Sequence, residues 1–214
     1  MRTNPFADTL AFLTQNWWPI YVFWLLLLGS IAIALANVAR DPEQRSGRHV
    51  WMWLVRLFIG GMWWQQTLWK LPPTYTDSPD GVSGGLHYWV GEMVQHAAFS
   101  SQSWLVQHVV QPNFYVFAPQ VYVTEVAIAV SLMLGILTRI GGLLGALMAV
   151  NLWLGLYRAS YEWPWAYFFL IILQITFIVY AAGRSLGLDA MLRRSAPLRV
   201  KSTSSLACLL PWLT

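Results

Sequence analysis

Apolar residues are concentrated in five long runs, which shorter polar segments separate. The runs cover about residues 18–38, 50–71, 114–134, 138–156 and 164–182. Each is close to the ~20 residues that an α-helix needs to cross a hydrocarbon layer of ~30 Å. The pattern predicts an all-α, polytopic membrane protein with five transmembrane helices.

Two further helical patterns lie outside these runs. Asn4 is a good N-cap and Pro5 a good first helical residue, and apolar residues follow at helical spacing as far as Trp17. We expect a short helix here that lies on the membrane surface. Residues 72–113 begin as a loop with several prolines and glycines, and residues 86–110 show apolar positions at helical spacing. This insert is expected to contain one or two amphipathic helices.

The positions of the charged residues predict the orientation. Most Lys and Arg residues lie in the loop 40–49, at Arg139 and in the tail after residue 183, whereas the opposite loops carry Asp77, Asp80 and Glu92. Basic residues collect on the cytoplasmic side of membrane proteins. The N-terminus is therefore predicted outside the cell and the C-terminus in the cytoplasm.

Composition supports a membrane protein and argues against nucleic-acid binding. The chain of 214 residues is 57% hydrophobic and 10% charged, whereas soluble domains are roughly 25% charged. The net charge of +4 comes from basic residues at the ends of apolar runs, not from a solvent-facing stripe. We therefore expect the lipid bilayer as a partner and no nucleic acid.

Polar residues inside the predicted spans are the candidates for chemistry. Glu125, Asn151, Gln174 and Gln65 fall at similar depth in four different runs, and Arg56 lies nearer the cytoplasmic side, from where its long side chain could reach Glu125. A charged group at the bilayer centre costs about 2.5 kcal/mol or more, so such residues are functional candidates. Glu125 and Arg56 are the catalytic candidates, and a midplane pocket of Glu125, Asn151, Gln174 and Gln65 is the candidate cofactor site.

Two interpretations of these polar residues stay open. They could line a pocket that binds a quinone, a proton or a substrate, or they could only hold helices together through hydrogen bonds in lipid. The glycines, including the Gly141/Gly145 pair, are expected to mark close helix contacts and not ligand loops.

No metal site is predicted. The four histidines show no pair at a spacing of three or four residues, so no single helix presents two histidine ligands. Cys208 is the only cysteine, which excludes a thiolate cluster within the chain.

Three ordered motifs resemble the DoxX/DoxD-like family of membrane proteins. Arg56 followed by Gly60-Gly61 and Lys70 resembles the first helix of that family's core, and Glu125 followed by LMLGILTRIGGL resembles its next helix hairpin. The ending AAGRSLGLDAML resembles the family's closing signature. The resemblance implies a four-helix core over residues 50–194 with the insert 72–113, preceded by an additional N-terminal span within 1–49 and followed by a cytoplasmic tail, 195–214.

The resemblance implies two functions and a location in the cell (inner) membrane of a bacterium or archaeon. One is an accessory or structural subunit of a larger respiratory or photosynthetic complex, with other membrane subunits as partners. The alternative is the quinone-reducing subunit of a thiosulfate:quinone oxidoreductase, with quinone as cofactor. The lack of a visible electron carrier in the sequence favours the accessory role, and the sequence leaves open whether the chain is an enzyme.

Overall fold

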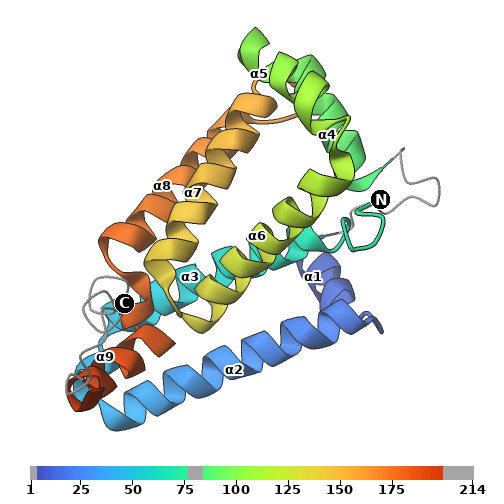
Figure 1. The fold of residues 1–214 in the computed structure, drawn as a ribbon. Coiled ribbons are helices and arrows are strands. Elements are labelled where there is room, and N and C mark those ends of the chain that lie inside the picture. Colours follow the sequence, from blue (N-terminus) through green and yellow to red (C-terminus); the bar gives the residue numbers. More distant parts are fainter. Residues whose placement is uncertain (1–3, 77–83, 200–214) are drawn as a thin grey trace.

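The chain folds into a bundle of helices. The computed structural model describes residues 4–76 and 84–199, and every regular element in these ranges is helical (Figure 1). The elements are α1 (Pro5–Leu13), α2 (Trp18–Arg40), η1 (Pro42–Arg45), α3 (Gly47–Thr67), α4 (Gly85–His96), α5 (Ser100–Leu105), η2 (Val106–Val110), α6 (Phe114–Leu134), α7 (Thr138–Gly155), α8 (Pro164–Val179), η3 (Ala182–Arg184) and α9 (Leu188–Arg199). The all-α fold class is confirmed for the described residues.

Three of the described helices, α2, α6 and α7, are long and apolar enough to cross a membrane. Helix α8 is also apolar, but its 16 residues span only ~24 Å. Helix α3 has 21 residues, and Arg56, Gln65 and Gln66 lie within it. Membrane character is therefore supported, whereas five spans and the orientation stay predictions. Asp77 and Asp80, on which the orientation partly rests, lie outside the described residues.

Two predicted spans are shorter in the structure than in the sequence pattern. Helix α3 ends at Thr67, four residues before the predicted end. Prolines at 72 and 73 cannot continue a helix, so the chain has to leave helical geometry before them. Helix α8 ends at Val179, and Ala181 then adopts a left-handed conformation with a φ of 45°.

The centre of the bundle is the packing of α3 on α6. Trp63 and Trp64 of α3 are buried in one cluster with Ile128 and Leu132 of α6. Gly60 allows this close approach, because a Cβ at this position would lie 2.9 Å from the backbone nitrogen of Met133. The two helices therefore touch backbone to backbone at Gly60.

Helix α7 packs against both α6 and α8, and Figure 1 shows α7 and α8 side by side. A Cβ at Gly141 would collide with Ser131 of α6, and a Cβ at Gly145 would collide with Gln174 of α8. The prediction that these glycines mark close helix contacts is confirmed.

A second core covers the far end of α6 and α7. Leu86, Val90 and Met93 of α4 pack with Phe114 at the start of α6 and with Leu156 after α7. Residues 86–110 form α4, α5 and the π-helical segment η2, so the prediction of amphipathic helices in this insert is confirmed. In Figure 1, α4 and α5 lie at the opposite end of the molecule from α9.

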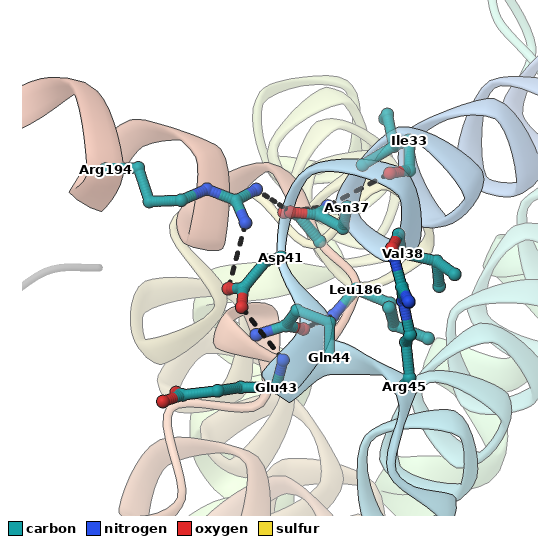
Figure 2. A network of polar contacts seen from close by, with 10 residues as sticks. Ile33, Asn37, Val38, Asp41, Glu43, Gln44, Arg45, Leu186 and Arg194 are labelled. Carbon is teal, nitrogen blue, oxygen red and sulfur yellow. Dashed lines mark hydrogen bonds and ion pairs between the residues drawn. The ribbon is translucent and has the colours of Figure 1, made fainter.

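Polar contacts join the end of α2 and η1 to residues 186–194 (Figure 2). The Arg194 guanidinium lies 3.0 Å from the Asp41 carboxylate and also donates to the Asn37 side chain. Asn37 Nδ2 donates to the Gly187 carbonyl at 3.1 Å, and the Leu186 N–H donates to Gln44 at 2.9 Å. The end of α2 and η1 are thus tied to residues 186–194. Residues 200–214, which include Cys208 and most of the predicted tail, lie outside the described residues.

The α3–α6 contact generates a test of the packing. Gly60→Ala should lower the thermal unfolding midpoint, because overpacking a close contact costs about 1–3 kcal/mol and a backbone atom cannot rotate away. The neighbouring Gly61→Ala is the matched control, since its Cβ would meet only the Phe23 ring at 3.5 Å. Both changes gain the same helix propensity, so their difference isolates the contact. Equal midpoints for the two variants in detergent would contradict this packing.

Candidate functional site

A buried ion pair joins α6 to the end of α3. Lys70 Nζ lies 2.5 Å from Glu125 Oε1, and the two side chains are 4% and 2% exposed. Lys70 Nζ also lies 4.2 Å from the centre of the Trp69 ring, which adds a cation–π contact. The carboxylate that the sequence places in the middle of a span is therefore neutralised by a lysine.

The antiparallel course of α3 and α6 explains this pairing. Lys70 comes three residues after the last residue of α3, and Glu125 is the twelfth residue of α6. Because the end of α3 lies towards the beginning of α6, the four-carbon stem of Lys70 only has to reach back along the bundle.

The ion pair forms part of the wall of a cavity of about 880 Å³ between α3, α4, α6, α7 and α8. Three of the lining residues are tryptophans, Trp63, Trp69 and Trp89. Small-molecule sites typically have volumes of roughly 300–1,000 Å³, with mostly apolar walls and a few polar groups. The cavity has the size and character of such a site.

Glu125 has a buried carboxylate oxygen that lacks a hydrogen-bond donor. Its Oε1 accepts from Lys70, whereas its buried Oε2 accepts no hydrogen bond from any described residue. A buried carboxylate oxygen without a donor is costly, by about 1–3 kcal/mol or more. A ligand that donates a hydrogen bond at this point would remove that cost.

Further polar side chains line the cavity. Gln66 of α3 and Asn151 of α7 line it, as does Glu162 in the α7–α8 connection. Glu162 accepts a hydrogen bond of 2.9 Å from the Tyr167 hydroxyl. Polar groups therefore stand at separate points of a largely apolar wall.

The structure brings together only part of the predicted midplane pocket. Glu125 and Asn151 both line the cavity. Gln174 is fully buried against Gly145 and does not line it, and Gln65 is exposed. One helix position turns a side chain by about 100°, so Gln66 and not Gln65 faces the cavity. The expectation of one pocket with all four predicted side chains is therefore wrong.

Arg56 does not contact Glu125, which corrects the expected pairing. The Arg56 side chain is completely buried, and its guanidinium donates to the carbonyls of Leu132 and Met133 at the end of α6. Leu132 lies seven residues beyond Glu125, which is ~10 Å along the helix. Arg56 therefore caps the C-terminus of α6, where the helix dipole favours a cation.

Asp189 performs the complementary task at the start of α7. Its carboxylate accepts from the backbone N–H groups of Leu137 and Thr138, at 2.7 and 3.1 Å, and from the Thr138 hydroxyl at 2.9 Å. Burial raises the pKa of Asp189, while these hydrogen bonds and the charge of Arg56 oppose that rise. An anion at a helix N-terminus is favoured by the same dipole.

Between these two caps the backbone is tightly packed. Gly135 ends α6 with a φ of 69°, and a Cβ there would collide with the Arg56 guanidinium. A Cβ at Gly183 would collide with Asp189. We call Arg56, Gly135, Thr138, Gly183 and Asp189 the turn cluster. It contains residues from each of the three motifs noted in the sequence, and its evident task is to hold the α6–α7 turn against α9.

Sequence reasoning missed Lys70 as the partner of Glu125. In the sequence, Lys70 stands out only as part of a motif at the end of the second apolar run, and not as the partner of a buried acid. Its position two residues before Pro72 and next to Trp69 was the available signal, since an interfacial lysine can bend its stem towards a buried acid. The described residues contain no group of three or more His, Cys, Asp or Glu side chains placed to hold a metal ion.

No family model, no curated protein and no solved structure matches this chain. The likeness to DoxX/DoxD-like proteins therefore stays an expectation drawn from the motifs.

The ion pair predicts strong coupling between its two members. Lys70→Met and Glu125→Gln should each lower the thermal unfolding midpoint in lipid nanodiscs, because breaking a buried pair from one side costs about 3–5 kcal/mol. The double variant Lys70→Met/Glu125→Gln should lose much less than the sum, since no unpaired charge remains. Additive losses would show that the two side chains do not interact.

Proposed function

We propose that this chain is an integral membrane subunit whose helix bundle binds a quinone-class ligand beside Lys70 and Glu125. The observation that supports this most is the buried ion pair in the wall of an otherwise mainly apolar cavity of about 880 Å³. Lys70 has three N–H donors and uses one on Glu125, so it can donate another to a ligand oxygen. Tryptophans and aliphatic walls suit a flat ring and an isoprenoid chain.

The membrane arrangement in this proposal has five spans. Helices α2, α3, α6, α7 and α8 cross the bilayer, with α3 and α8 as the less apolar and the shorter members. Arg56, Gln66 and Trp63 of α3 face the bundle interior, which reduces the cost of placing this helix in lipid. The turn cluster and α9 lie on the cytoplasmic side of a bacterial or archaeal cell membrane, and α4 and α5 lie on the opposite side.

The chain acts in this proposal together with a redox partner. A single cysteine cannot form a thiolate cluster, so another subunit or a bound redox group exchanges electrons with the quinone. This chain then supplies the binding site and its charges. The family resemblance adds weight to a quinone as the ligand class.

The ligand site can be tested by filling the cavity. Val121 of α6 lines the cavity, whereas Val123 of the same helix is 61% exposed. Val121→Trp should weaken the binding of decylubiquinone at least about tenfold, measured by quenching of tryptophan fluorescence in micelles, because the new indole occupies the site. Val123→Trp adds the same indole on the outer surface and should leave the affinity unchanged. No saturable quenching in the unmodified protein would contradict the proposal.

A second candidate function is an accessory subunit of a larger membrane complex. The observation that favours it is the outward face of α2, where large apolar side chains are exposed along the whole helix: Tyr21, Trp24, Leu25, Leu28, Ile31 and Leu35. Such a face can pack against a helix of a neighbouring subunit as well as against lipid.

Native gel electrophoresis distinguishes this second candidate. After mild solubilisation of the host membranes, an accessory subunit should migrate with partner polypeptides in one defined band. Migration of the chain alone, under conditions that preserve other complexes of the same membrane, would contradict an accessory role.

A further inference from the structure

The polar groups at the cavity favour one redox form of a quinone-class ligand over the other. This inference rests on the proposed function. We propose that the Lys70–Glu125 site binds the quinol form, which carries O–H groups, in preference to the quinone. The preference follows from the hydrogen-bonding groups that the ion pair leaves available.

The pair presents an ionised carboxylate. Lys70 Nζ lies 2.5 Å from Glu125 Oε1, and both side chains are almost completely buried. The close contact fits a charge-assisted hydrogen bond between an ammonium and a carboxylate, and the preference applies to this ionised form of the pair. Glu125 therefore acts only as an acceptor, and Lys70 only as a donor.

The second carboxylate oxygen is the deciding atom. Glu125 Oε2 is buried, the residue lines the cavity, and no described residue donates a hydrogen bond to this oxygen. A ligand placed here gains most if it brings a donor. A ligand that has only hydrogen-bond acceptors would place one of them next to the negatively charged Oε2, and the two would repel each other.

The two redox forms differ in this property. A quinol hydroxyl can donate to Glu125 Oε2 and at the same time accept from Lys70 Nζ, so it matches both members of the pair. A quinone carbonyl can accept from Lys70, but it offers nothing to Oε2. Hydrogen bonds to charged groups are about twice as strong as neutral ones, so the missing donor should have a large effect on affinity.

The experiment compares three probes of nearly the same shape. Decylubiquinol, decylubiquinone and the dimethyl ether of decylubiquinol are titrated anaerobically into the full chain in micelles, and tryptophan quenching gives each dissociation constant. We expect the dissociation constant of decylubiquinol to be at least about tenfold lower than those of the other two probes, because only decylubiquinol carries an O–H donor. The ether makes the test independent of any protein variant.

A protein variant removes the effect of unequal partition into micelles. Glu125→Gln replaces the carboxylate by an amide, so the ratio of quinone to quinol dissociation constants should fall at least about tenfold relative to the unmodified chain. Lys70→Met/Glu125→Gln serves the same purpose if the single variant does not fold. Glu43→Gln makes the same change at an exposed position of η1 and should keep the original ratio.

The outcomes separate this inference from the proposed function. Saturable binding with equal affinity for all three probes, or with the quinone tightest, would overturn the quinol preference and leave quinone-class binding intact. An unchanged ratio in Glu125→Gln would also overturn it. No saturable binding of any probe would overturn both.

Discussion

The candidate site depends on one interaction, the contact between the Lys70 ammonium and the Glu125 carboxylate inside a helix bundle. In hydrocarbon either charge alone would be costly, so each stabilises the other in its place. The contact ties the end of α3 to the middle of α6. Both residues line a cavity with mainly apolar walls, and the second carboxylate oxygen of Glu125 is buried and accepts no hydrogen bond from a described residue. The same pair is therefore both a structural contact and the polar part of a candidate binding site.

The turn cluster shows that a conspicuous motif can be structural. Arg56 was a candidate for chemistry because it is a charged residue in an apolar run. In the structure it caps the carbonyl end of α6, while Asp189 caps the amide end of α7. There is too little room for a side chain at Gly135 in the α6–α7 turn and at Gly183 in η3. Most residues of the motifs that resemble DoxX/DoxD-like proteins thus hold a tight helical turn in place. Within these motifs, Glu125 and Lys70 are the candidates for ligand binding.

The sequence predicted the parts of the fold that periodicity and hydrophobicity control. Run lengths gave the helices, Asn4 gave the start of α1 through its side-chain cap, and glycine positions gave the close contacts of α7. It also placed Glu125 and Asn151 on one wall. The sequence did not predict which face of a helix points to the cavity, nor which residue pairs with a buried charge. Gln65 and Gln66 differ by one helical step, and Lys70 reaches Glu125 because the end of α3 lies beside the middle of α6, which is a property of the packed bundle.

The Lys70–Glu125 ion pair can be tested through the charge state of Glu125. Infrared difference spectroscopy of the unmodified chain against Glu125→Gln in lipid nanodiscs isolates the bands of this one side chain. An ionised pair with Lys70 predicts that the substitution removes carboxylate stretching bands and no carboxylic-acid carbonyl band. A carboxylic-acid band that disappears in Glu125→Gln would contradict the ion pair with Lys70, because a protonated Glu125 carries no charge.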